Sequence, residues 1–300
     1  MADAPAVGLD TASSPAAIAR PSEWRRVRRV PWLAIGTVGV FVLIALLAGV
    51  ISPGDPYAQS LRQRLRPPVW MEGGTWANPL GTDRLGRDLL SRIFHGARVS
   101  LTVGATAVTV AGAVGAAVGI LAGYRGGRVG AALMRVTDAT LAFPIILLAL
   151  VLAVTLGPSF GNVVLSVALI LWARYARVLY GEVISLMERE FIVQARAIGC
   201  SGWRIMVHHL LPNTANTLIV LLSLQVGYVI VVEAALSFLG AGIPPPTPAW
   251  GSMIAEGREY VTTAWWVSFF PGLAILLVVL AFNLLGDWLR DTLDPRLRQL

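Results

Sequence analysis

The chain of 300 residues has no lysine, a single cysteine and three histidines. A Walker A loop needs a lysine to reach the β- and γ-phosphates of a nucleotide, so the chain has no such loop. Schiff-base chemistry with pyridoxal phosphate is excluded for the same reason. The single cysteine, Cys200, permits neither an intrachain disulfide nor a cysteine-cluster metal site. If ATP drives this protein, we expect another polypeptide to bind it.

Residues that carry catalysis or bind metal ions are also scarce. His208 and His209 are adjacent, so they point to different faces of a helix and make a poor metal pair. No H-E-x-x-H segment occurs. The polar residues of the apolar runs lie mostly toward the ends of those runs instead of clustering at one depth. We therefore predict that the chain is not an enzyme and holds no metal or cofactor of its own.

The chain contains few charged residues, and its net charge is positive. Only 14% of the residues are charged, 56% are hydrophobic, and the isoelectric point is near 10.4. This composition is too apolar for an ordinary soluble domain. The 24 basic residues, all arginine, are spread between apolar runs, so no separable basic domain exists to bind nucleic acid. They are better interpreted as topology signals and as contacts to lipid headgroups.

Six apolar runs predict an all-α, polytopic membrane protein with six transmembrane helices. The runs are residues 32–51, 99–123, 139–156, 162–172, 214–232 and 265–286. Pro144 is expected to kink the third, and the fourth helix to continue into the cytoplasm past Arg174 and Arg177. We expect residues 1–30 to be a disordered cytoplasmic tail, 31–52 the first span, and 53–98 an extracytoplasmic segment that includes an interfacial helix over 89–98. Residues 99–286 are expected to form the transmembrane core, including cytoplasmic helices at 183–212, and residues 287–300 a cytoplasmic tail.

Arginine counts set the expected orientation. Of the 24 arginines, 16 fall on the proposed inside and 8 on the outside, which places both chain ends in the cytoplasm. The first outside segment is an exception, because it is rich in arginine. Its GTDRLGRD stretch at 81–88 alternates Asp and Arg, which either pair with each other or bind an anion. Thr82 or Asp83 is expected to cap the helix that follows.

Four features of the spans and outer loops stand out. Ala111, Gly115, Gly119 and Gly123 repeat every four residues, which favours close helix approach in lipid. Glu233 lies close to the membrane core, where a carboxylate is costly and often functional. The structural alternative is that it is paired, or exposed at the outer interface. The loop over 241–259 contains four prolines and is expected to be stiff and extended. Three tryptophans suit an aromatic belt at the interface: Trp250, Trp265 and Trp266.

Residues 190–212, EFIVQARAIGCSGWRIMVHHLLP, predict two short amphipathic helices on the cytoplasmic side. Gly199 supplies the left-handed residue that ends the first helix, and Ser201 is expected to cap the second. Pro212 is expected to close the second helix before the next span. Two interpretations remain open at this point: a surface element packing on its own protein, and a docking element for another protein.

Four ordered segments resemble the peptide and nickel branch of the ABC-importer permeases. Residues 81–92 fit its GTD-x-x-GRD-x-x-SR signature, and 195–212 resemble its EAA loop through Ala195, Gly199, Leu211 and Pro212. Val193, Gln194 and His209 depart from the general EAA motif. Residues 237–258 and 280–298 also match, so the resemblance covers nearly all of 32–298. It is to the second permease subunit of such importers, and it implies a type I importer fold.

The resemblance implies a bacterial cytoplasmic membrane protein that imports di- or oligopeptides. Nickel, glutathione or another small solute is the alternative cargo, and a stand-alone secondary transporter is the alternative class. Implied partners are a second permease subunit, two cytoplasmic subunits that bind ATP and Mg²⁺, an external substrate-binding protein and membrane lipid. The residues expected to couple to the ATPase are Phe191, Ala195, Arg196, Ala197, Gly199, Trp203, Met206, Leu211 and Pro212.

Two further sets of candidates concern the substrate. Polar residues of the spans are candidates for the substrate path: Gln225, Glu233 and Asn283. Residues of the last outside loop are candidates for an external gate or a binding-protein contact: Leu239, Gly240, Pro246 and Trp250.

Overall fold

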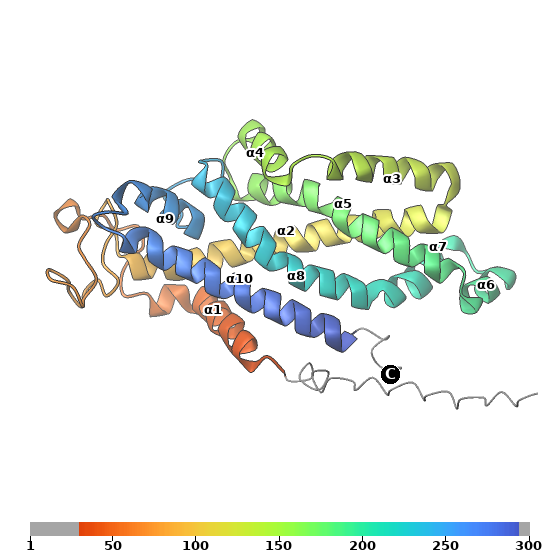
Figure 1. Ribbon diagram of the computed structural model, residues 1–300, viewed down its shortest axis with the longest axis horizontal. Helices are drawn as coiled ribbons and strands as arrows, with labels where there is room; N and C mark the ends of the chain where they lie inside the picture. The colour runs from red at the N-terminus through yellow and green to blue at the C-terminus, as the bar shows by residue number, and fades with distance from the viewer. Residues whose placement is uncertain (1–29, 294–300) are drawn as a thin grey trace, which may run out of the picture.

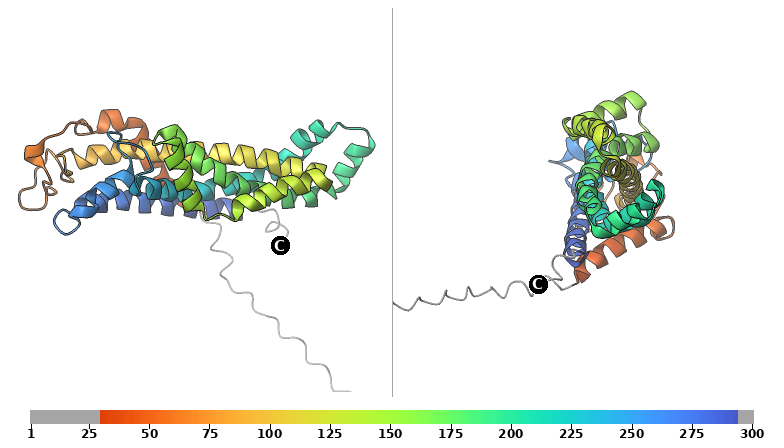
Figure 2. Two further views of the ribbon diagram at one scale, coloured as in Figure 1. Left: turned by 90° about the horizontal axis from the view of Figure 1, so that it is seen from above. Right: turned by 90° about the vertical axis from the view of Figure 1, so that its right-hand side faces the viewer.

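The computed structural model describes residues 30–293 as an elongated helical bundle (Figure 1). The tail predicted over 1–30 and the end of the tail predicted over 287–300 therefore lie outside the described residues. Five long helices run along the bundle: α1 (Trp32–Ile51), α2 (Leu89–Arg125), α5 (Phe160–Met187), α8 (Leu211–Phe238) and α10 (Trp266–Leu293). The stretch before α2 and helix α9 (Trp250–Gly257) form one end of the bundle. Helices α6 (Glu190–Ala197) and α7 (Gly202–Ile205) protrude at the opposite end (Figure 2).

The all-α membrane fold is confirmed, with one difference in the third span. Five helices are long and apolar enough to cross a bilayer, and a bent pair makes up to six. The pair consists of α3 (Gly127–Leu141) and α4 (Ile145–Leu156), which meet at 90°. The bend expected at Pro144 is therefore present, but helical structure begins at Gly127, well before the predicted start of this span at residue 139. Pro144 has no N–H and disfavours helical geometry in the residue before it, so the helix breaks there.

Helix α2 joins two elements that the sequence analysis kept apart. The interfacial helix predicted over 89–98 is not separate, because α2 continues through residue 98 to Arg125. The cap also differs from the prediction: Asp88 Oδ2 accepts hydrogen bonds from the Ser91 N–H (2.8 Å) and Ser91 Oγ (2.7 Å). Thr82 and Asp83 cannot cap α2, since their side chains bind Gln63 and Arg87 instead.

Close packing between α2 and α5 confirms the predicted small-residue stripe. A Cβ atom added at Gly115 would lie 2.5 Å from the Trp172 carbonyl oxygen, and one at Gly119 would lie 2.7 Å from the Ala176 carbonyl oxygen. Both obstacles are backbone atoms, which cannot rotate away as a side chain end can. The two helices therefore approach as closely as they do only because these positions carry no side chain.

Substitution of Gly119 by alanine should lower the melting temperature of the purified protein. We expect an overpacking loss of about 1–3 kcal/mol, because the new methyl group forces α2 and α5 apart. Gly181→Ala is the matched control, since a Cβ at Gly181 meets nothing within 4 Å. Scanning fluorimetry in detergent measures both variants. Equal melting temperatures for Gly119→Ala and Gly181→Ala would contradict the packing argument.

Helix α5 begins at a serine whose sequence surroundings invite a different interpretation. Residues 157–161, GPSFG, have the G-x-S-x-G spacing of a hydrolase nucleophile. Here the segment joins two helices, and Ser159 Oγ accepts a hydrogen bond from the Asn162 N–H (3.1 Å). A nucleophile elbow requires a strand-to-helix turn, so Ser159 is a helix cap and not a nucleophile.

The second of the two short helices predicted over 190–212 does not end at Pro212 as expected. Helix α7 continues through a π-helical turn, η3 (Met206–Leu210), directly into α8, so Gly202–Phe238 reads as one helix of 37 residues. In this turn the Leu211 N–H donates to the Met206 carbonyl, five residues earlier. Pro212 then lies in the first turn of α8. The wider turn accommodates the proline, which has no N–H to donate, and the helix continues without a stop.

Candidate functional site: the α6–α7 turn and the polar residues of the bundle

The turn between α6 and α7 has the geometry that its sequence predicts. Gly199 has φ +82°, in the left-handed region. The Cys200 N–H donates to the Ala195 carbonyl and the Gly199 N–H to the Arg196 carbonyl, both at 3.0 Å. This pair of hydrogen bonds is a Schellman motif, which satisfies the last carbonyls of α6. Ser201 Oγ accepts from the Arg204 N–H (3.3 Å) and caps α7, as expected.

One face of the turn is packed and the other is open. Ile192, Ala195, Ile205 and Leu210 are buried in a small core together with Ile120 and Val183. This core attaches the turn to the ends of α2 and α5. On the open side, Ile198 is 80% exposed and Trp203 is 72% exposed. Apolar side chains this exposed, at the tip of the molecule, make this side of the turn a candidate for a protein-binding surface.

The predicted coupling residues divide between the two faces of the turn. Ala195 is buried and Met206 is partly buried in the small core. Arg196 is exposed, and its guanidinium carbon lies 5.7 Å from the centre of the Tyr124 ring, within cation–π range. The remaining predicted residues are exposed: Phe191, Ala197, Gly199, Trp203, Leu211 and Pro212. Four large apolar residues of the turn are exposed, and we name them together the α6–α7 surface: Phe191, Val193, Ile198 and Trp203.

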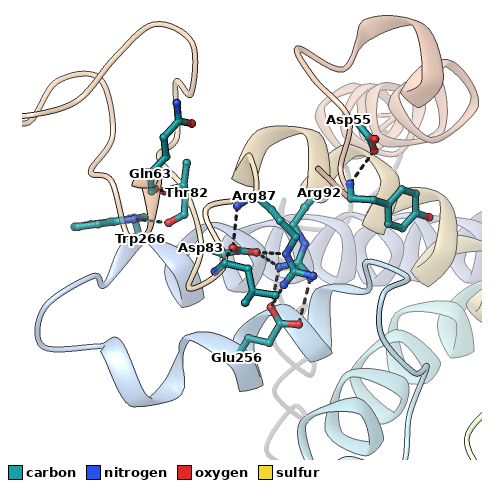
Figure 3. Close-up of polar contacts among 10 residues, drawn as sticks. Asp55, Gln63, Thr82, Asp83, Arg87, Arg92, Glu256 and Trp266 are labelled. Atoms are coloured by element: carbon teal, nitrogen blue, oxygen red, sulfur yellow. Dashed lines mark hydrogen bonds and ion pairs between the residues drawn. The ribbon is translucent and has the colours of Figure 1, made fainter. Parts of the chain in front are cut away.

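At the opposite end, a buried charge network joins the outer loop to α2 and α9 (Figure 3). Arg87 Nε lies 2.6 Å from Asp83 Oδ2, and Arg87 Nη2 lies 2.6 Å from Glu256 Oε2. Arg92 Nη1 pairs with Asp83 and also lies 2.8 Å from Glu256 Oε2. Two arginines and two carboxylates balance in charge, and each carboxylate contacts both arginines. The self-pairing interpretation of the Asp/Arg stretch is therefore correct, but the pairs are buried and not on a surface.

This network explains part of the arginine-rich outer segment. Arg98 also has a structural role, since its Nε donates to the Ala45 carbonyl at 2.9 Å and so ties α2 to α1. Arg64 Nη2 donates to Tyr260 Oη at 3.1 Å. Four of the outer arginines therefore hold the chain together instead of reporting its orientation. The sequence analysis missed Glu256, the network member farthest away along the chain, because no local pattern links it to residues 83–92.

The three path candidates are not brought together. Glu233 is buried on α8, where its carboxylate accepts hydrogen bonds from Ser237 Oγ (2.7 Å) and Ser100 Oγ (3.2 Å). It is thus paired inside the bundle and not exposed at the outer interface. Gln225 is buried and faces Arg174 of α5. Asn283 is exposed on α10 beside Gly227, on a different side of α8 from Gln225.

The four residues of the outer loop also separate. Leu239, Gly240 and Pro246 are exposed. Trp250 is fully buried at the start of α9, where its Nε1–H donates to the Ile93 carbonyl at 3.1 Å. Residues 250–257 are helical, so the predicted extended loop ends before Trp250.

The expected aromatic belt is also largely wrong. Trp250 is inside the protein, and Trp266 is buried with its Nε1–H directed at the Thr82 carbonyl (Figure 3). Only Trp265 of the three is exposed. Both buried indoles bond to backbone carbonyls of the outer end, so they brace that end and do not contact headgroups.

These observations define a multi-helix membrane component with an exposed apolar turn at one end and a braced cap at the other. The chain belongs to the family described as the binding-protein-dependent transport system inner membrane component, whose model matches residues 115–299. The matched segment covers more than half of the chain, including α5, the α6–α7 turn, α8 and α10. Permeases of this family are multi-pass proteins of the inner membrane.

Named relatives cover almost the whole chain. The di/tripeptide transport system permease protein of Pseudomonas aeruginosa is 44% identical over 259 residues, which is 86% of each chain. The dipeptide transport system permease protein of Escherichia coli K12 is 44% identical over 278 residues, covering 92% of this chain and 93% of the relative. A putative peptide transport system permease protein of Brucella suis is 43% identical over 279 residues, 91% of each.

Proposed function

We propose that this chain is a permease subunit of an ATP-driven importer that carries di- or oligopeptides across the cytoplasmic membrane. The names of its relatives support peptides as the cargo. The absence of lysine supports a division of labour, because this chain has no Walker A loop to bind the nucleotide. The proposed partners are a second permease, two ATPase subunits holding ATP and Mg²⁺, and an external binding protein.

The observation that carries the coupling role is the continuity of Gly202–Phe238. A displacement of α7 acts on α8 without a flexible joint, because α7, η3 and α8 form one helix. On the other side of the turn, α6 is separated from α5 by only Glu188 and Arg189. Closure of the ATPase subunits against the α6–α7 surface would therefore move α5 and α8 as levers. Leu239, Gly240 and Pro246 lie at the far end of α8, where such a movement would open or close the outer mouth.

Reconstitution tests this function directly. The chain is co-expressed with its candidate partners, purified as a complex, and placed in proteoliposomes with ATP inside. A labelled dipeptide and the binding protein are supplied outside. We expect uptake that requires both ATP and the partners. Uptake of nickel or glutathione but not of peptides would show that the cargo is not a peptide. Uptake by the chain alone, driven by a proton or sodium gradient, would refute the coupling role.

Trp203 provides a specific test of the α6–α7 surface. Trp203→Ala should reduce ATP-dependent uptake about tenfold, because a central exposed tryptophan is typical of the residues that dominate a protein interface. Its indole is mostly solvent-exposed, so the fold of the chain should not change. Trp76→Ala, at an exposed position of the outer end, is the matched control and should leave ATPase co-purification unchanged. Normal co-purification and uptake for Trp203→Ala would contradict the proposed surface.

A further inference from the structure

Arg174 is a charged residue within a long apolar helix, and its only described polar partner is an uncharged amide. It lies in the middle of α5 and is exposed. The salt bridges found within residues 30–293 do not include it. With the Gln225 amide oriented so that its oxygen faces Arg174, that oxygen accepts hydrogen bonds from Arg174 Nε and Nη1, both at 3.3 Å. A buried amide on α8 thus holds a guanidinium whose charge is not neutralised.

The position of Arg174 along α5 places it within the membrane. It lies 14 residues after Phe160, which is about 21 Å along the helix. The hydrocarbon core is about 30 Å thick, so a helix that starts at Phe160 has not yet crossed it at Arg174. Gln225 gives the same depth, since it lies 13 residues from Phe238, about 20 Å along α8. This placement differs from the expectation that α5 has already entered the cytoplasm at Arg174.

An exposed arginine at this depth does not face lipid. A charged side chain in the hydrocarbon core costs about 2.5–3.5 kcal/mol even on the most lenient scale, unless it reaches the headgroups. The bonds to Gln225 keep the guanidinium at the level of that buried amide, which prevents such an extension. The free side of Arg174 must then face water or another polar group. In a permease, the water-filled region at this depth is the substrate path.

We propose that Arg174 is an anion-recognition site in the path, where it binds a carboxylate of the peptide as the peptide passes. This proposal rests on the proposed function in naming a peptide as the ligand. A guanidinium is suited to the role, since its planar fork of N–H donors matches a carboxylate and is permanently charged. Nε and Nη1 are engaged by Gln225, which leaves Nη2 and the second N–H of Nη1 for the ligand. Gln225 is then a positioning residue for Arg174.

Arg177, one helical turn further on, shows the contrasting arrangement. It pairs with Asp138 of α3 and so has its countercharge within the chain. Arg174 is exposed and Arg177 is partly exposed, and each carries one positive charge. A substitution at Arg177 therefore changes the net charge of α5 by the same amount as one at Arg174, but removes a charge that is already neutralised. This makes Arg177 the matched control for the anion site.

The test compares three dipeptides in the reconstituted importer: Ala-Ala, Asp-Ala and Ala-Arg. Uptake is measured at saturating binding protein loaded with each peptide, so that affinity for the binding protein does not enter the rates. We expect Arg174→Gln to lower the ratio of Asp-Ala to Ala-Arg uptake about tenfold, since one close charge interaction in a partly dry site is of that size. Arg174→Glu should lower the ratio further. Arg177→Gln should leave it within about twofold of the unsubstituted protein.

Two outcomes would overturn the proposal. Uptake of all three dipeptides by Arg174→Gln that equals that of the unsubstituted complex, in rate as well as in ratio, means that the guanidinium does not meet a carboxylate of the peptide. Loss of the second permease on purification of Arg174→Gln means that the charge belongs to a subunit contact instead. Failure of the proposed function is distinguishable from either result, because the unsubstituted complex would then take up none of the three dipeptides.

Discussion

Valine at position 199 should abolish ATP-driven uptake, whereas asparagine there should preserve most of it. Gly199 ends α6 with φ +82°, a conformation that costs an L-residue about 1–2 kcal/mol and a β-branched residue more. Asparagine tolerates this region better than other side chains do. A Cβ at Gly199 would meet nothing within 4 Å, so the substitution introduces backbone strain without a clash. The two variants thus differ mainly in whether the turn keeps its shape.

The measurements are uptake, stimulated ATPase activity and recovery of the complex on size-exclusion chromatography. For Gly199→Val we expect uptake at least tenfold below that of Gly199→Asn, because the strained turn misdirects α7 and hence the whole helix to Phe238. Recovery of the two complexes should be similar, since the membrane spans are untouched. Equal uptake by both variants would show that the left-handed turn is dispensable for coupling.

Local sequence signals predict this end of the molecule well. Gly199 and Ser201 act within a few residues: the Gly199 N–H donates to the Arg196 carbonyl, and Ser201 Oγ accepts from the Arg204 N–H. A single sequence therefore contains all that is needed to place them. The stripe of Gly115, Gly119 and Gly123 is equally readable, because its period of four is a property of one helix. What the stripe does not reveal is its partner: α5 is identified only by the three-dimensional structure.

Other parts of the fold depend on contacts that no local pattern records. Pro212 predicts a helix end from its chemistry, yet the π-turn before it carries the helix onward. Trp250 looks like an interfacial tryptophan, but Gly96 and the Ile93 carbonyl provide a buried place for it on α2. In both cases tertiary structure decides between two conformations that the sequence permits. The candidate path residues lie apart for the same reason, since side-chain direction around α8 separates Gln225 from Asn283.

The buried charge network gives the largest expected effect on stability. Arg92→Ala should destabilise the protein by about 3–5 kcal/mol, because it leaves Asp83 and Glu256 sharing only Arg87 in a site closed to water. For a protein of this size the melting temperature should fall by about 10 °C, measured in detergent by scanning fluorimetry. Arg84→Ala is the control: Arg84 is exposed nearby, and its loss should change stability by less than about 0.5 kcal/mol.

A double substitution separates the loss of a charge from the loss of a side chain. Arg92→Met with Glu256→Met removes one positive and one negative charge, and it leaves Asp83 paired with Arg87 at 2.6 Å. Since a buried ion pair is often replaceable by apolar residues of similar volume, we expect the double variant to be more stable than Arg92→Ala. If it is less stable, the network holds α9 to the outer loop by its specific hydrogen bonds. Charge balance would then contribute less to the stability of the protein than these hydrogen bonds do, and the network would act mainly to position the outer mouth.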